Sequence, residues 1–390
     1  MSLFQVLDDK NYNCKRICVE GTFYELEEVD KPIITDTWNY YPYLEDLPIE
    51  YAQLYAEGKT PSQVCPEGLK EEFKQINNKL KAYYRSFATS KINLDKYCFY
   101  DLVPDKVVRE YARIKDLICK YVFDTYDKPE NYNHMLKIIK IITDIRPLNI
   151  DKRMAKMINY NKCPSGVLSY NPFTSKTGRL GINSKSFPIL NIKKEDRVVI
   201  VPHNDMFVNL DYNAAELRVL LGLNGEKQPS IDIHEHNRQI LKKDKTRTEV
   251  KKMTFAWLYG SEREEHVEVQ DFGFAYDKKK ILDKYYRDGI VYTDFRRKIK
   301  ADDHHALSYI IQSTASDMFL EQVYEIRKLL KGKKSFVSFM VHDNVAIDLH
   351  REDRSLVREI KRIFEDTRYG KILSTLEMGK NFGEMEKINI

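Results

Sequence analysis

The sequence has few of the residues and patterns that mark membrane, secreted or zinc-binding proteins. Only six cysteines and two tryptophans occur among its 390 residues. No apolar run is long enough to cross a membrane, and the first residues lack a signal-peptide pattern. Cys14 and Cys18 form a C-x-x-x-C pair without a matching second pair, which is weak evidence for zinc. We therefore expect a cytoplasmic protein with scattered reduced thiols and no membrane partner.

Neither sign of charge dominates the chain. The formal net charge is +5, from 64 basic and 59 acidic residues. A charged fraction of 32% beside 42% hydrophobic residues is ordinary for a globular protein, and the length allows two or three domains. The mild basic excess permits a polyanionic partner without requiring one. Basic clusters at 242–252 and 296–300 are more informative, although a solvated helix face explains either cluster alone.

The most informative segment is RTEVKKMTFAWLYG, in which Arg247, Lys251, Phe255 and Tyr259 are spaced four apart. On an α-helix these four residues share one broad face, with two cations followed by two aromatic rings. The cations suit a triphosphate, and the rings suit a stacked base. An amphipathic helix with a solvated basic end and an aromatic core stripe would show the same pattern. The functional interpretation therefore depends on partner residues elsewhere in the chain.

Two aspartates are each presented by predicted strands. Residues 206–210 form an apolar, partly β-branched run that predicts a buried strand, and Asp211 lies at its end. Residues 335–341 and 345–349 predict two more strands, and Asp343 lies in the tight turn between them. A turn or capping role explains either aspartate alone.

Two such carboxylates together with a basic-aromatic helix fit phosphoryl transfer assisted by two divalent ions. Mg²⁺ is usually held by one or two carboxylates, while phosphate oxygens and water complete its coordination. We predict that Asp211 and Asp343 bridge two Mg²⁺ ions, for which Mn²⁺ can substitute. We also predict that Arg247 and Lys251 hold the β- and γ-phosphates of the substrate.

Six ordered segments between residues 177 and 344 resemble motifs of the family A, or polymerase-I-like, DNA polymerases, particularly their compact phage members. DYNAAELR resembles motif A, RTEVKKMTFAWLYG motif B and VHDN motif C. TSKTGRL, DIHEH and IIQSTASD resemble the T-G-R motif, the D-I-H segment and the helix with a minor-groove Gln. The resemblance implies an α+β right-hand fold, with an antiparallel palm sheet and helical fingers and thumb. It also implies template-directed addition of deoxynucleotides to a primer 3′ end, in phage DNA replication.

The resemblance assigns roles to individual residues. It implies that Asp211, Asp343 and the backbone carbonyl of Tyr212 bind the metals, and that Lys251 takes part in catalysis. The residues implied to bind the deoxynucleoside triphosphate are Arg247, Lys251, Phe255, Tyr259, His234 and Glu216. The residues implied to contact primer–template DNA are Arg179, Gln312 and His342.

Glu216 bears on the choice of sugar. The resemblance implies that its carboxylate lies under the incoming sugar, where a 2′-hydroxyl would have no room, especially with Tyr259 on the other side. Deoxynucleotides are therefore the expected substrates. A carboxylate in the first turn of a helix is also favoured by the helix dipole, and both explanations can hold together.

The expected domains follow the motifs. We expect an N-terminal region of uncertain role at 1–90, a thumb-like helical region at 91–165, a palm at 166–221 and 311–390, and fingers at 222–310. The apolar spacing also predicts a long helix over about 303–330 that backs the palm sheet. About 90 residues are too few for a proofreading exonuclease domain. We expect no proofreading by this chain, and a separate exonuclease or processivity protein is a candidate partner.

Two alternatives remain open. A single-subunit RNA polymerase lacks the bulky acidic residue that Glu216 supplies here. A polymerase fold that has lost catalysis and serves as a DNA-binding or processivity subunit would have lost Asp211 or Asp343, and both are present. One departure from the family pattern concerns the metal site, because Asn344 follows the motif C aspartate where many members have Glu.

Overall fold

The computed structural model describes residues 3–7, 14, 16–25, 34–94, 96–158, 166–241, 245–258 and 276–390. Helices and strands are both abundant, so the predicted α+β class is confirmed. The chain forms two compact units, Met1–Leu136 and Lys137–Ile390. The division expected near residue 90 does not coincide with a boundary between these units, because helices on either side of it pack together in the first.

The first unit combines a small sheet with long helices. Its antiparallel strands are β1 (Phe4–Leu7), β2 (Arg16–Val19) and β3 (Thr22–Glu25). Helix α3 (Lys70–Thr89) packs against α5 (Asp105–Thr125), which also contacts β1. The apolar residues Phe73, Ile76 and Leu80 recur every three or four positions of α3, and all three are buried. The shorter elements of this unit are β4 (Asp36–Thr37), β5 (Glu50–Tyr51), α1 (Ala52–Tyr55), α2 (Pro61–Val64) and α4 (Phe99–Leu102).

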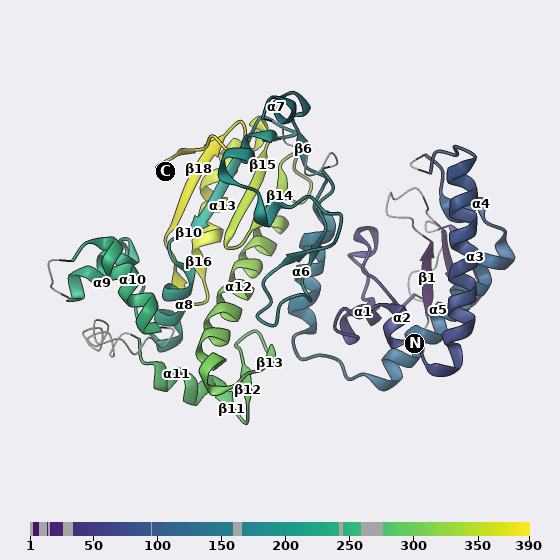
Figure 1. Ribbon diagram of the computed structural model, residues 1–390, viewed down its shortest axis with the longest axis horizontal. Coiled ribbons are helices and arrows are strands. Elements are labelled where there is room, and N and C mark those ends of the chain that lie inside the picture. The colour runs from purple at the N-terminus through teal and green to yellow at the C-terminus, as the bar shows by residue number, and fades with distance from the viewer. Residues whose placement is uncertain are drawn as a thin grey trace. The chain divides into compact units, whose positions relative to one another are not determined.

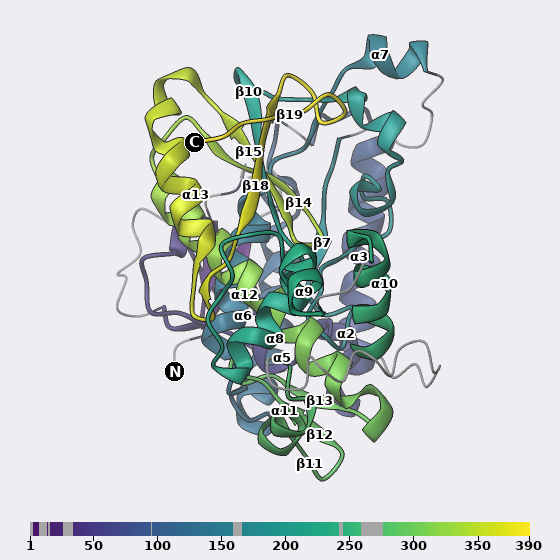
Figure 2. The same ribbon diagram turned by 90° about the vertical axis from the view of Figure 1, so that its left-hand side faces the viewer.

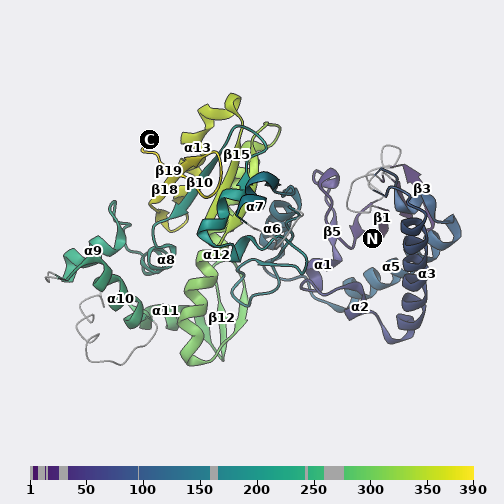
Figure 3. The same cartoon turned by 45° about the horizontal axis from the view of Figure 1, so that its top comes forward.

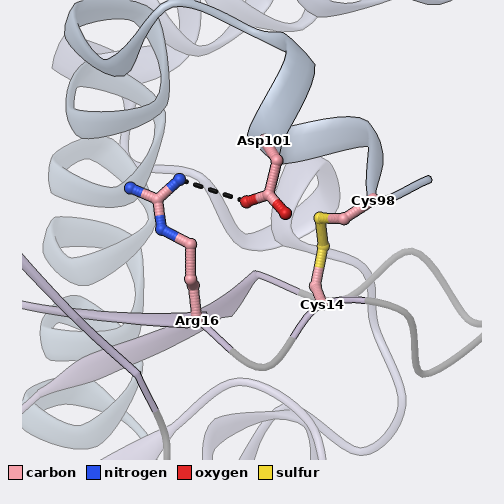
Figure 4. Close-up of a disulfide and its surroundings, with 4 residues drawn as sticks. All are labelled: Cys14, Arg16, Cys98 and Asp101. Carbon is pink, nitrogen blue, oxygen red and sulfur yellow. Dashed lines mark hydrogen bonds and ion pairs between the residues drawn. A yellow bond between two sulfur atoms is a disulfide. The ribbon is translucent and has the colours of Figure 1, made fainter.

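The structure corrects the expectation that every thiol is reduced. Cys14 and Cys98, 84 positions apart, form a disulfide beside the ion pair of Arg16 and Asp101 (Figure 4). Cys14 precedes β2 and Cys98 precedes α4, so tertiary packing brings together two thiols that sequence spacing does not relate. The free cysteines among the described residues are buried: Cys18, Cys65 and Cys119. Cys163 lies outside the described residues.

The second unit is built on a five-stranded antiparallel sheet with strand order β14-β15-β10-β18-β19 (Figure 1). The strands are β10 (Met206–Tyr212), β14 (Phe336–Val341), β15 (Asn344–Leu349), β18 (Ser374–Gly379) and β19 (Glu386–Lys387). The three strands predicted from apolar runs are therefore confirmed. Strand β10 continues two residues beyond the expected end, so Asp211 still belongs to the sheet.

Two helices cover one face of this sheet. Helix α12 (Asp303–Leu330) has the predicted bounds and packs against β14 and α13 (Val357–Glu365), while α13 contacts β10 and β18 (Figure 2). Asp302 caps α12 by accepting a hydrogen bond from the backbone N–H of His305. The apolar residues that predicted the helix are all buried: Leu307, Ile310, Ile311, Met318, Val323 and Ile326.

Helices α8 (Ala215–Asn224), α9 (Ile233–Leu241), α10 (Arg247–Leu258) and α11 (Lys278–Tyr285) gather at one end of the second unit (Figure 3). They are followed by the strands β11 (Tyr286–Arg287), β12 (Ile290–Tyr292) and β13 (Lys298–Lys300), which form an antiparallel sheet. The remaining elements of the chain are α6 (Tyr132–Asp144), α7 (Lys152–Met157), β6 (Asn149–Ile150), β7 (Tyr170–Asn171), β8 (Gly181–Ile182), β9 (Ile200–Val201), β16 (Asp366–Thr367) and β17 (Gly370–Lys371). Among the described residues, no helix combines the length and apolarity needed to cross a membrane.

Candidate active site

The register of the central sheet brings Asp211 and Asp343 together. Asp211 on β10 lies opposite Asn344 on β15, and Asp343 immediately precedes Asn344 in the turn between β14 and β15. Val341 pairs with Asn344, so His342 and Asp343 form a two-residue turn. His342 has a φ of 55°, in the left-handed region, which costs about 1 kcal/mol or more for a residue with a side chain. The turn thus holds a strained residue beside the carboxylate.

Both aspartates line one open cleft. Polar side chains spaced two apart on the strands share its wall, because alternate residues of a strand point to the same face. They are Asn209 and Asp211 on β10, and Thr375 and Glu377 on β18. Glu377 lies opposite Asn209, whose amide donates a 3.3 Å hydrogen bond to it. Basic residues also line the cleft: Lys194, Arg197 and Lys387.

The two aspartates are held in an unfavourable environment for negative charge. The Asp211 side chain is exposed to the cleft, but the surrounding protein still removes part of its solvation; this loss of solvation, then the charges of Asp343 and Glu377, raise the pKa of Asp211 to about 6. Burial also raises the pKa of Asp343; Glu216 adds to this effect, whereas Arg179 opposes it. Carboxylates that destabilise one another in a cleft are typical of sites that bind a cation.

The oxygen atoms around this cleft fit a hard divalent cation such as Mg²⁺. Asn209 is 4% exposed, and its side-chain oxygen finds no hydrogen-bond partner within the described part of the chain. The side-chain oxygen of Asn344 likewise has no hydrogen-bond partner within the described part of the chain. No three His, Cys, Asp or Glu side chains of the described residues are close enough to hold a metal by themselves. Bound ions would therefore draw on Asp211 and Asp343, with substrate phosphates and water completing the coordination.

A second, much narrower cavity gathers five of the predicted residues. The lining residues among the predicted set are Arg179, Glu216, Gln312, His342 and Asp343. Arg179 forms an ion pair with Glu216, which lies in the first turn of α8. Gln312 comes from α12. Residues predicted to contact DNA and the sugar thus lie beside the motif C aspartate, although they come from separate parts of the chain.

Helix α10 carries the predicted cationic residues and pairs one of them with α9. Arg247 at its first position donates two hydrogen bonds to Asp232, from Nε at 2.9 Å and from Nη2 at 2.7 Å. Asp232 also accepts the backbone N–H groups of His234 and Glu235, as an N-cap of α9 does. Lys251 is exposed one turn further along α10.

His234 is buried beside α10. Its ring centroid lies 6.0 Å from that of Phe255, and it is 2% exposed. Burial lowers its pKa to about 4; Asp232 opposes this shift, and the charges of Arg247 and Lys251 add to it. Its Nδ1 finds no partner among the described residues, so a neutral imidazole is poised next to the predicted phosphate clamp.

Some predicted residues are not brought to the aspartates. Of the described residues that line the two cavities, none comes from α10. Tyr259, the last residue of the predicted face, lies outside the described residues. The Tyr212 side chain anchors the end of β10, since its hydroxyl donates to the Phe364 carbonyl at 2.5 Å and the two rings stack at 4.0 Å. The metal-binding role of its backbone carbonyl stays a prediction.

Sequence analysis missed three residues that build this site. Glu377 was not predicted as a site residue. Once β18 is known to pair with β10, the alternation of side chains along a strand places Glu377 on the same face as Asp211. Asp232 lies in the DIHEH segment, but the sequence predicted a role only for His234 there. Arg218 is completely buried and donates to the carbonyls of Asn213, Pro229 and Ile231, and so ties the loop before α9 to the end of β10. No local pattern distinguishes such an arginine from a solvated one.

Comparison with known proteins gives one curated relative, the DNA polymerase of Mycobacterium phage D29. The two sequences are 24% identical over an alignment of 248 positions that covers 54% of this chain and 40% of the relative. This chain therefore matches well under half the length of that polymerase. Among solved structures, the chain is similar to the POL domain of Pol1 from M. smegmatis in complex with DNA primer-template and dNTP. The TM-score is 0.48 and the sequence identity is 12%, and the match covers 80% of this chain and 66% of that one. No protein-family model matches the chain.

Proposed function

We propose that this chain is a template-directed DNA polymerase that extends a primer 3′ end with deoxynucleotides, as part of phage DNA replication. The observation that carries the proposal is the register of β10 with β15, which places Asp211 beside Asp343 in one polar cleft. The curated similarity to a phage DNA polymerase supports the same class of reaction. When bound at these aspartates, two Mg²⁺ ions supply the activation of the attacking hydroxyl and the stabilisation of the leaving oxygen.

The protein's own residues supply positioning and charge. Asp211 and Asp343 are positioned by the end of β10 and by the turn between β14 and β15, next to the place proposed for the reacting phosphate. Arg247 and Lys251 are the donors for the β- and γ-phosphates, and Lys251 is proposed to assist the leaving group. His234 is proposed to contact a phosphate, and Phe255 and Tyr259 to stack against the base and sugar.

Arg179, Gln312 and His342 are proposed to contact the primer–template duplex. Their gathering around one small cavity beside Asp343 supports this assignment, because a primer end that contacts them would lie next to that aspartate. The triphosphate would then lie on the side of the open cleft that Asp211 lines. Most binding energy should come from phosphate contacts and depend on salt rather than on sequence.

The proposed domains follow from these roles. Residues 166–221 and 311–390 supply all five strands of the central sheet and form the palm. Residues 222–310 form the fingers, 91–165 the thumb, and 1–90 a region whose role is left open. The host cytoplasm is the proposed location, and a separate exonuclease or processivity protein is the proposed additional partner.

Template-directed extension by single nucleotides tests the proposal. A labelled primer on four templates, which differ only in the first unpaired base, is offered one deoxynucleotide at a time with Mg²⁺. We expect extension only by the complementary deoxynucleotide, and poor extension by the matching ribonucleotide. Addition without regard to the template would contradict the proposal. Binding of the duplex without extension would favour the catalytically inactive DNA-binding subunit instead.

A further inference from the structure

A buried ion pair lies directly behind the turn that presents Arg179. Arg297 follows the turn between β12 and β13, and Asp317 lies on α12. The Arg297 guanidinium donates from Nε to one Asp317 oxygen at 3.0 Å and from Nη2 to the other at 2.7 Å. The two side chains are only 11% and 0% exposed. The basic cluster at 296–300, for which a solvated face was the default expectation, therefore contains one arginine that belongs to the interior.

The guanidinium lies against Gly178, the residue immediately before Arg179. A Cβ at Gly178 would lie 2.5 Å from Arg297 Nη2 and 2.7 Å from its Cζ. Gly178 also has a φ of +76°, which side-chain-bearing residues rarely adopt. Its N–H donates to the Ser175 carbonyl at 3.2 Å and closes a tight turn. Both the backbone conformation and the flat guanidinium therefore fix this position as glycine.

The same ion pair reaches the helix that carries Gln312. Asp317 follows Ser316, which lines the narrow cavity together with Arg179 and Gln312. One face of the ion pair thus supports the Gly178 turn, and its other end is part of α12. A two-pronged Arg–carboxylate pair has a fixed planar geometry, so it can set the separation of the two elements that it joins.

We propose that Arg297 and Asp317 are positioning residues that set the spacing between Arg179 and Gln312, and thereby the rejection of mispaired primer ends. The inference rests on the proposed polymerase function and on the minor-groove roles assigned to Arg179 and Gln312. Minor-groove contacts test the geometry of a base pair, so they discriminate only when their separation is held constant. An ion pair this well buried is weak evidence for stability alone, because apolar side chains of similar volume often replace such pairs without loss.

The test compares extension from matched and mismatched primer ends. Arg297→Lys keeps the charge but cannot reproduce the two-pronged geometry, and Arg296→Lys makes the same change at the exposed neighbour. We expect Arg297→Lys to reduce the ratio of kcat/KM for matched over mismatched ends roughly tenfold, with KM for the next deoxynucleotide and thermal stability little changed. Arg296→Lys should leave the ratio at the wild-type value.

A second variant guards against a folding defect. The double substitution Arg297→Met/Asp317→Leu keeps buried volume without the charges, and should show the same loss of discrimination in a folded protein. In an Arg179→Ala background, Arg297→Lys should have little further effect on the ratio, since both changes act on one contact. If wild type extends matched primers but the ratio is unchanged in folded Arg297→Lys and in the double variant, the positioning role of Arg297 and Asp317 is overturned while the proposed function stands. If wild type extends no primer, the proposed function falls, and this inference falls with it.

Discussion

Arg247 and Asp232 form a two-pronged ion pair between the first residue of α10 and the N-cap of α9. The guanidinium proposed to hold the triphosphate is thus already bound to a carboxylate. An incoming nucleotide must therefore compete with Asp232 for the Arg247 guanidinium. The pKa of Asp232 lies well below its ordinary value. Burial of Asp232 opposes this lowering, and the hydrogen bonds from Arg247 and Asn213 cause it.

Asp232→Asn should therefore strengthen nucleotide binding. The amide keeps an oxygen that can cap α9, but it loses the charge that holds Arg247. Because the Arg247 side chain is half exposed, the pair contributes no more than about 1 kcal/mol, and we expect a deoxynucleotide Kd lowered by up to about fivefold. Titration of the enzyme–duplex complex with deoxynucleotide measures this value. Glu235→Gln, which breaks the neighbouring Arg238 pair, serves as the control and should leave the Kd unchanged. Weaker binding by Asp232→Asn would show that the pair orients Arg247 productively.

The Asp211 pKa predicts a pH-dependent stability in the absence of divalent ions. Its value rises from 3.8 to about 6 on folding, so the folded state holds this proton more tightly than the unfolded state. The contribution of this group to the free energy of unfolding is therefore highest below about pH 4 and falls as pH rises to about 6. Asp211→Asn removes that penalty. At pH 7.5 in a chelator we expect Asp211→Asn to be more stable by about 1 kcal/mol, after allowance for solvent screening of this exposed side chain.

Denaturant unfolding at pH 7.5 and pH 4.5 checks this prediction. The stability gain of Asp211→Asn should be present at the higher pH and mostly lost at the lower one. Glu226→Gln, at an exposed position that lines neither the cleft nor the narrow cavity, provides the matched control and should show neither effect. A gain of equal size at both pH values would mean that the charge of Asp211 is not its cause.

Glu216 should govern sugar selection. Glu216→Ala removes the carboxylate proposed to exclude a 2′-hydroxyl, and it also releases Arg179 from its ion pair. We expect ribonucleotide incorporation to rise at least tenfold relative to deoxynucleotide incorporation, in line with 1–3 kcal/mol for loss of a steric or polar contact. Arg179→Ala separates the two effects, because it breaks the same ion pair and should leave the sugar ratio near wild type. Unchanged sugar selectivity in Glu216→Ala would rule out the gate.

Arg218 should be important for stability. Arg218→Met leaves three carbonyl acceptors without their donor in the interior, which costs about 3 kcal/mol or more in the free energy of unfolding. Arg238→Met, on the exposed face of α9, removes an arginine paired only at the surface and should cost less than about 1 kcal/mol. Denaturant unfolding of the two variants compares them directly, and equal losses would contradict the role given to Arg218.

Local periodicity was sufficient to predict much of the sheet and its backing helix. Apolar runs located β10, β14 and β15, and helical spacing gave α12 its observed bounds. The local placement of Asp211 at a strand end and of Asp343 in a turn depends on residues close together in the sequence. That the two aspartates meet was predicted from the chemistry of a two-ion site and from the motif resemblance, whereas the pairing of β10 with β15 that brings them together could not be predicted from local sequence.

The partners of individual side chains could not be predicted in this way. The Cys14–Cys98 disulfide, the Arg179–Glu216 pair and the Arg297–Asp317 pair each join residues brought together only by tertiary packing. In a basic cluster, nothing local marks Arg297 as the buried member. For the same reason Glu377 emerges only from the register of β18 with β10, which places it on the wall of the cleft that Asp211 and Asn344 also line.

Primer extension by charge-neutral variants of the two aspartates tests the two-metal site most directly. Wild type, Asp211→Asn, Asp343→Asn and the control Glu226→Gln are compared with Mg²⁺ and with Mn²⁺, and duplex binding is measured in parallel. Because Asp211 and Asp343 are both proposed to hold the ions, either substitution should reduce the extension rate by about a thousandfold or more, while duplex binding and the control stay near wild type. Extension at the wild-type rate by either aspartate variant would contradict the assignment of this cleft as the catalytic site.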